Sequence, residues 1–255
     1  MRTAFQRMMV ASLVLTLSAG IAQAAEVKVL VAGALQNAVR PLAADFEKQT
    51  GNKVTLTATV PALLVKELAG GQYDVVAAAL PSMAEFDESG KFQAGTRAPV
   101  ARTGIGIAIR EGAPKPDLST IAAFKKAVLA AKNIIYTDPS TPNASGGNTQ
   151  HILANAELLD VVKKKGLQEG LAPGRERIAK GEYEMGFFNV SEAVAPGIVL
   201  AGPVPAPLQM YLYYDVAVLK SAAAKNEAAS FAKFLTAKAA EPRWKAAGLD
   251  QLPPR

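Results

Sequence analysis

The chain has 255 residues, half of them hydrophobic, with a formal net charge of +6, no cysteine and one histidine. The lack of cysteine excludes a disulfide framework, a thiolate metal site and a cysteine nucleophile, and one histidine is too little for a histidine-based zinc site. The basic excess suits an anionic ligand. No dense Lys/Arg block with interleaved aromatic residues is present, so we expect no nucleic-acid partner.

The first 24 residues have the pattern of a secretory signal peptide. Arg2 and Arg7 form a basic start, residues 8–19 are a short apolar run, and Ala22-Gln23-Ala24 is a small-residue cleavage site. We place cleavage after about Ala24 and expect an exported, periplasmic protein. The apolar run is shorter than the roughly 20 residues that a membrane helix needs.

Residues 26–57 are predicted to form a strand, a tight turn, a helix and a second strand. An apolar, β-branched run stops at Gly33, apolar residues then recur at helical spacing up to Gly51, and residues 54–57 resume as a strand. The turn Gly33-Ala34-Leu35 directs the free N–H groups of a helix start beyond the first strand, where they form a seat for an anion. The alternative is an ordinary strand-helix-strand unit with nothing bound.

The pattern of alternating strands and helices continues along the chain and predicts a parallel sheet covered on both faces. A helix over residues 81–89 has Ser82 as N-cap and Glu85 completing a capping box. A turn-rich segment, 138–148, opens onto a helix over 149–158 and repeats the arrangement of a strand end that leads into backbone amides. The other predicted strands are 73–79, 104–109, 133–137, 185–189 and 210–219, and the other helices are 62–68, 119–132, 161–165, 175–180, 222–238 and 242–247.

We predict an α/β protein of two lobes, each a mainly parallel sheet flanked by helices. The first lobe comprises residues 25–100 and 205–255, after an extended crossover at 203–207, and the second comprises residues 101–204. Strands that cross near Ala101 and Ala201 would form a hinge, with the ligand in the cleft between the lobes.

Five segments in this order resemble type II periplasmic binding proteins, most closely the molybdate-binding proteins of ABC transporters. They are VLVAGALQNAVRPLAADFEKQTGNKV, LLVKELAGGQYDVVAAA, DPSTPNASGGNTQHIL, GEYEMGFFNVSEAV and YDVAVLKS. The resemblance covers nearly the whole mature chain. It implies the two-lobed fold, a monomer without a cofactor, and a small anionic ligand that is delivered to an inner-membrane ABC permease.

The resemblance also implies that several ligand-binding hydroxyl groups are lost. In the molybdate proteins two serines and a tyrosine bind the oxyanion, and these positions match Ala34, Val60 or Pro61, and Asn189. Each lost donor costs about 1 to 3 kcal/mol. We therefore expect a ligand other than molybdate, unless neighbouring Ser and Thr hydroxyls replace the missing ones; the candidates are Thr57, Thr59 and Ser140.

The amide donors of the family match Ala144 and, more loosely, Leu171, so the backbone seats are kept. The missing side chains leave room for a larger anion, and a small organic di- or tricarboxylate fits. Arg102 could clamp a carboxylate bidentately, although it can equally pair with a surface Asp or Glu. Tyr214 either faces the cleft or packs in the core. The predicted ligand-binding residues are Gly33, Ala34, Leu35, Thr59, Val60, Pro61, Arg102, Ser140, Ala144, Asn148, Thr149, Leu171, Asn189, Ser191 and Tyr214, with no metal ligand.

The alternative is an enzyme, because some proteins that resemble this family are periplasmic aconitate isomerases. These move a proton to interconvert cis and trans forms of a tricarboxylate, which requires a general base and a carboxylate clamp but no metal. His151 would be the base or acid, Arg102 the clamp, and Ser140, Thr141 or Ser191 the carboxylate donors. A lone helical histidine is more often an exposed side chain, so we favour a binding protein over a cofactor-free isomerase.

Overall fold

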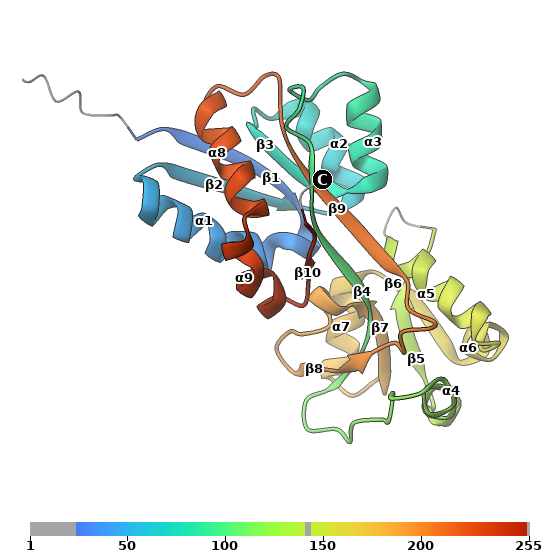
Figure 1. Cartoon of the computed structure of the whole chain (residues 1–255). Helices are drawn as coiled ribbons and strands as arrows, with labels where there is room; N and C mark the ends of the chain where they lie inside the picture. Colours follow the sequence, from blue (N-terminus) through green and yellow to red (C-terminus); the bar gives the residue numbers. More distant parts are fainter. Residues whose placement is uncertain (1–23, 141–143, 254–255) are drawn as a thin grey trace, which may run out of the picture.

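The computed structural model describes residues 24–140 and 144–253. The predicted signal peptide up to residue 23, and Thr141, lie outside these ranges. Within them the chain forms a ten-stranded mixed sheet with helices on both faces (Figure 1), which confirms the predicted α/β class. The strand order is β2-β1-β3-β9-β4-β7-β5-β6, and β8 and β10 also pair with β4.

The first part of the chain follows its apolar pattern closely. Its elements are β1 (Glu26–Ala32), the 3-10 helix η1 (Gly33–Leu35), α1 (Gln36–Thr50), β2 (Lys53–Thr59), α2 (Pro61–Gly70), β3 (Val75–Ala79) and α3 (Leu80–Glu88). α1 ends where predicted, because Gly51 takes a left-handed φ of +74° at its C-cap. The capping box predicted for α3 is wrong: the N-cap is Ala79, and Pro81 occupies the first turn, where a missing N–H costs nothing.

The remaining elements include two short strands that the apolar pattern did not predict, β6 and β10, and β8, which contains Ala201, near which a crossing strand was predicted. The elements are β4 (Ala98–Arg110), α4 (Ile121–Ala130), β5 (Ile134–Thr137), α5 (Ala144–Asn155), α6 (Leu159–Lys165), β6 (Gly166–Glu169), α7 (Leu171–Ala179), β7 (Met185–Asn189), η2 (Val190–Glu192), β8 (Ile198–Pro203), β9 (Tyr211–Val218), α8 (Lys225–Thr236), η3 (Lys238–Ala240), α9 (Glu241–Ala246) and β10 (Asp250–Gln251).

The long strand β4 joins two parts of the sheet (Figure 1). From Ala98 to Gly104 it pairs with β9, and from Ile105 to Arg110 it pairs with β7 and β8, antiparallel in each case. The parallel parts are therefore β2-β1-β3 on one side and β6-β5-β7 on the other. Ala201, where we predicted a crossing strand, lies in β8, which pairs with the second half of β4, while β9 pairs with its first half. The lobe boundaries near residues 100 and 204 stay a prediction.

Each part of the sheet has its own apolar core. In the first part, α1, α8 and α9 cover one face around Phe46, Phe231 and Trp244, while α2 and α3 cover the other face around Leu64 and Phe86. The fully buried Trp244 donates its indole N–H to the Leu235 carbonyl at 3.0 Å. None of the described helices has the length and apolar character needed to cross a bilayer.

In the second part, aromatic residues pack from helix to strand and orient the sheet against α4 and α5. Phe124 of α4 meets Phe187 of β7 edge to face, with ring centroids 6.2 Å apart. Ile152 and Leu153 of α5 belong to the same cluster. The face of β7 that carries Phe187 is therefore the face covered by α5.

Candidate functional site

The first predicted anion seat lies where β1 ends. Gly33–Leu35 form η1, in which Ala34 is 7% exposed and Leu35 is fully buried, and neither η1 nor α1 has a side-chain cap on its first N–H groups. The register of β1 and β2 pairs Ala32 with Thr59. The half-buried Thr59 and the exposed Val60, which is the N-cap of α2, thus lie at the same edge as Ala34, and Pro61 begins that helix.

The second seat lies at the end of β5, where α5 begins at Ala144. A Cβ atom on Gly146 would collide with the Thr137 carbonyl and the backbone of Pro139, so glycine permits the helix to approach the strand end this closely. The buried Thr149 hydroxyl donates to the Ser145 carbonyl at 2.7 Å, and the Ser145 hydroxyl donates to Thr137 Oγ1 at 3.0 Å. Both hydroxyls are therefore bound by groups of the protein itself.

The start of α5 corrects one sequence prediction. The helix begins at Ala144 and not at Thr149, so Asn148, Thr149 and His151 lie beyond its first turn. At 1.5 Å per residue His151 is roughly 10 Å along the axis from the helix start. Its side chain is exposed, which leaves it poorly placed to serve as a base beside the first amides. Ser140 is also exposed, and its N–H binds Asp138 Oδ1 at 2.8 Å.

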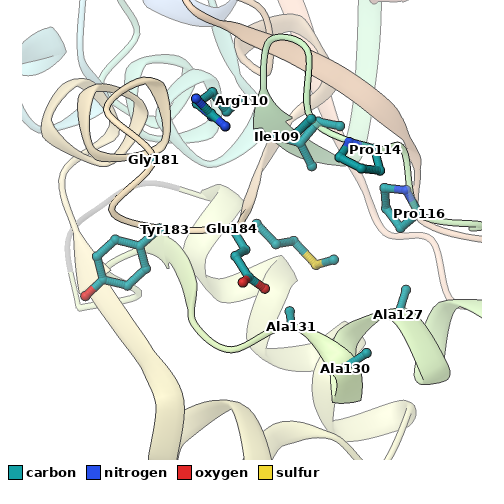
Figure 2. Close-up of a pocket in the computed structure, with 12 residues that line it drawn as sticks. Ile109, Arg110, Pro114, Pro116, Ala127, Ala130, Ala131, Gly181, Tyr183 and Glu184 are labelled. Carbon is teal, nitrogen blue, oxygen red and sulfur yellow. The ribbon is translucent and has the colours of Figure 1, made fainter.

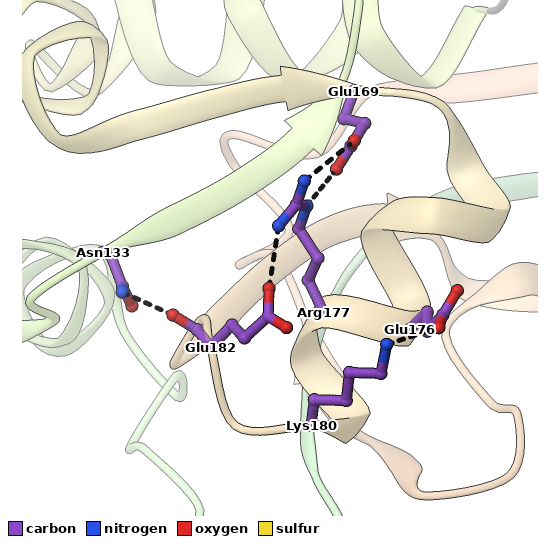
Figure 3. Close-up of polar contacts among 6 residues, drawn as sticks. All are labelled: Asn133, Glu169, Glu176, Arg177, Lys180 and Glu182. Carbon is purple, nitrogen blue, oxygen red and sulfur yellow. Dashed lines mark hydrogen bonds and ion pairs between the residues drawn. The ribbon is translucent and has the colours of Figure 1, made fainter.

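Leu171 is the first residue of α7, so its amide lies among the unpaired N–H groups of that helix start. Figure 3 shows how this helix is held against the preceding strand. Arg177 pairs with Glu169, the last residue of β6, at 2.6 Å and with Glu182 at 2.8 Å, and Glu176 pairs with Lys180. The bidentate contact to Glu169 fixes the helix relative to the strand end that precedes it.

A buried polar cluster lies where β7 ends. It consists of the buried Asn189 and Ser191 and the half-buried Glu192, with Tyr214 of β9 nearby. Asn189 is 3% exposed, Ser191 6% and Tyr214 1%. The Asn189 amide nitrogen donates to Glu192 Oε2 at 2.8 Å. Among the described residues, Asn189 Oδ1 and Ser191 Oγ are buried polar atoms without a hydrogen-bond partner.

The electrostatics of this cluster follow from its burial. Burial raises the pKa of Glu192 above its ordinary value, and the Asn189 hydrogen bond and the charge of Arg175 oppose that shift. Burial also raises the pKa of Tyr214 well above its ordinary range, and the Glu192 charge adds to the effect. Glu192 was not among the predicted site residues, although it directly follows Ser191 in the sequence.

The two parts of the sheet meet at these strand ends. η1 packs against η2, so Ala34 comes close to the segment that carries Ser191 and Glu192. β4 connects the cluster, because Ile105 pairs with Asn189 while Ala101 pairs with Tyr214. α5 contacts both β7 and β9. The structure therefore brings Ala34, Asn189, Ser191 and Tyr214 together, next to the start of α5.

Arg102 is engaged elsewhere. Its Nε atom pairs with Asp250 Oδ2 at 3.1 Å, and its guanidinium lies 4.1 Å from the centre of the Tyr211 ring. The Arg102–Asp250 ion pair is the second of the two alternatives that the sequence allowed for Arg102, pairing with a surface carboxylate. Clamping of a ligand by Arg102 would require the Asp250 pair to separate.

A cavity of about 510 Å³ lies at a different place, between the end of β4, α4 and the start of β7 (Figure 2). Ile109, Pro114 and Pro116 line one side, and Ala127 and Ala131 line the other. Ala131 precedes β5 and Met185 begins β7, so the cavity is at the amino ends of these parallel strands. Ligands of open α/β sheets bind outside the carboxyl ends, where the polar cluster lies. In residues 24–140 and 144–253, no group of three or more His, Cys, Asp or Glu could hold a metal ion.

The chain is similar in sequence and in fold to several known proteins. The chain is 29% identical over 233 residues to the aconitate isomerase of a Pseudomonas species, covering 88% of this chain and 87% of that protein. It is also 29% identical over 218 residues to the molybdate-binding protein ModA of Azotobacter vinelandii, covering 81% and 84%. The substrate-binding domain of a putative molybdenum ABC transporter from Clostridium difficile has the same fold, with a TM-score of 0.74, 18% identity, and coverage of 90% of this chain and all of that one.

These similarities confirm the resemblance seen in the sequence and the fold that it implied. The model of the family described as bacterial extracellular solute-binding protein matches residues 27–250. The match includes both helix-start seats and the buried polar cluster. This chain therefore belongs to the bacterial extracellular solute-binding protein family.

Proposed function

We propose that this chain is a periplasmic, monomeric solute-binding protein that captures a small organic di- or tricarboxylate and delivers it to an inner-membrane ABC permease. The ligand would lie between η1, the start of α5 and the η2 segment. The observation that carries the proposal is the pair of buried atoms without partners, Asn189 Oδ1 and Ser191 Oγ, beside helix starts whose N–H groups suit carboxylates.

The choice of an organic anion rests on two side chains. Ala34 offers a methyl group, and no hydroxyl, at the η1 seat. Asn189 offers a carbonyl oxygen, which repels a fully deprotonated oxyanion but accepts a hydrogen bond from a hydroxyl group, which an organic acid can carry beside its carboxylates. A tetrahedral oxyanion would therefore have to rely on amides and on Thr59, the half-buried hydroxyl at the same edge.

A thermal-unfolding screen of the purified protein tests this proposal. The ligands are citrate, cis- and trans-aconitate, malate, molybdate, tungstate and sulfate at equal concentration. A ligand present at 100 times its Kd stabilises the fold by about 2.7 kcal/mol, which corresponds to a rise of several degrees in Tm. We expect that rise with at least one carboxylate. A rise with molybdate or tungstate alone would contradict the proposal.

The second candidate is an aconitate isomerase-type enzyme, favoured by the 29% identity to such an enzyme across 88% of this chain. Proton transfer at carbon needs a base beside the ligand. His151 is exposed on α5, whereas Glu192 is half-buried beside the polar cluster and has a raised pKa. We therefore favour Glu192 over His151 as the proton acceptor in this reaction. The reaction would use no cofactor.

Incubation of the protein with trans-aconitate, followed by chromatography of the products, tests the second candidate. Formation of cis-aconitate that is abolished by Glu192→Gln and retained by His151→Asn would support it. Absence of turnover at high protein concentration would refute it, and binding of aconitate without turnover would leave transport as the function.

A further inference from the structure

The Asn189 amide has a fixed orientation. Its nitrogen donates to Glu192 Oε2 at 2.8 Å, and an ionised carboxylate can only accept hydrogen bonds. The amide nitrogen must therefore face Glu192 while that side chain is charged. The carbonyl oxygen, Oδ1, is turned away from Glu192 and has no partner among the described residues.

The Asn189 side chain lies on the face of the sheet that α5 covers. Side chains alternate along a strand, so Asn189 shares a face of β7 with Phe187 and Met185. Both of these residues belong to the cluster that includes Ile152 and Leu153 of α5. Asn189 ends this row at the carboxyl end of β7, next to η2, which packs against η1.

A buried carbonyl oxygen in this position needs a donor from the ligand. An unsatisfied buried acceptor destabilises a complex, and a site built to bind a hydroxyl group rejects analogues without it. Carboxylates and fully deprotonated oxyanions offer no donor, whereas a hydroxyl group does. Ser191 Oγ, which is also buried and without a partner, can donate to a carboxylate oxygen of the same ligand.

We infer that Glu192 is a positioning residue that orients the Asn189 amide, so that the site selects hydroxycarboxylates over the same carboxylates without the hydroxyl group. This inference rests on the proposed function. It adds the substrate class and the residue that sets it, which neither the helix-start seats nor the similar proteins specify.

Calorimetric titration with two matched ligand pairs tests the inference. The pairs are malate with succinate, and citrate with propane-1,2,3-tricarboxylate, each differing only by one hydroxyl group. In the wild type we expect the hydroxylated member of a pair to bind at least about tenfold more tightly, since one unmade hydrogen bond at a buried acceptor has about that effect. Glu192→Gln frees the Asn189 amide to rotate, so the ratio within each pair should fall toward one.

Two further variants separate orientation from stability. Asn189→Leu keeps a similar volume but removes the acceptor, so it should also bring the ratio toward one. Glu176→Gln makes the same charge change on the surface of α7, where Glu176 pairs only with Lys180 in Figure 3, and should leave the ratio unchanged. The ratio is the informative readout, because a loss of folded protein weakens both members of a pair equally.

The outcomes are distinct. Equal affinities within both pairs in the wild type would overturn the inference while leaving carboxylate capture intact. A ratio in Glu192→Gln as large as in the wild type would overturn the positioning role of Glu192. Binding of none of the four anions would overturn the proposed function, and this inference with it.

Discussion

Gly248, which follows α9, packs against the η2 segment, and one added methyl group there should disturb both the fold and the site. A Cβ atom at this position would lie 2.9 Å from Val190 Cγ1 and 3.2 Å from the Ser191 nitrogen, and the residue has a left-handed φ of +73°. A non-glycine residue in this conformation costs about 1 to 2 kcal/mol, and overpacking adds about 1 to 3 kcal/mol. We expect Gly248→Ala to lower the free energy of unfolding by about 2 to 4 kcal/mol.

Gly51→Ala is the matched control, because Gly51 has a φ of +74° but no atom within 4 Å of an added Cβ. The control should show the conformational cost alone, about 1 kcal/mol. Urea unfolding followed by fluorescence of Trp244, the single tryptophan, measures both variants. Gly248→Ala should also weaken ligand binding, while Gly51→Ala should not. Equal effects of the two substitutions on stability would refute the packing argument.

The remaining predictions concern three polar side chains. Lys165→Met should lower the free energy of unfolding by about 1 to 3 kcal/mol. The reason is that Lys165 Nζ donates hydrogen bonds to three backbone carbonyls at 2.6 to 2.9 Å, those of Val128, Leu129 and Ala131. An unchanged urea midpoint would contradict this prediction. Asp74→Ala should lower the free energy of unfolding by about 2 to 4 kcal/mol, since this buried carboxylate accepts hydrogen bonds from the backbone nitrogens of Lys28 and Ala223 at 2.8 and 2.7 Å. Asp74→Asn keeps one acceptor oxygen and should restore part of the loss in the same urea assay. The raised pKa of Glu192 means that the folded state holds this proton more tightly than the unfolded chain. The wild type should therefore lose stability relative to Glu192→Gln as the pH rises from 4.5 through the raised pKa, and a difference in Tm that does not change with pH would contradict the assigned burial.

The elements that the sequence predicted well have long, uninterrupted apolar patterns. β1, α1 and β2 form one such unit, and β7 begins and ends at the predicted residues. The missed strands β6 and β10 lack such a pattern. β10 is the polar pair Asp250–Gln251, which becomes a strand only because it lies beside Arg102 and Ala101 of β4. Pairing of this kind is decided by tertiary contacts that local sequence does not encode.

The start of α5 shows a second reason why sequence alone misplaces an element. A glycine pair in a turn-rich segment indicates a loop, yet Gly146 lies inside the helix, because its missing Cβ permits contact with the end of β5. This early start moved His151 out of the first turn. A helix boundary set by close backbone approach is visible only once the strand and the helix are placed together.

The candidate site was predictable in part. Asn189, Ser191 and Tyr214 were named from the sequence, and the structure brings them together with Ala34 in a buried cluster. Whether they bind ligand stays a prediction. Glu192 was missed because its importance comes from burial and from its hydrogen bond to Asn189, not from its residue type.

Isothermal titration of the wild type and of Ala34→Leu with citrate and with molybdate tests the central claim most directly. Ala34 is 7% exposed at the η1 seat, so a leucine side chain there should occupy the space that the ligand needs. We predict that citrate binds the wild type, that molybdate does not, and that Ala34→Leu remains folded by thermal unfolding but no longer binds citrate. Tight binding of molybdate without citrate, or citrate binding that is unchanged in a folded Ala34→Leu variant, would contradict the claim.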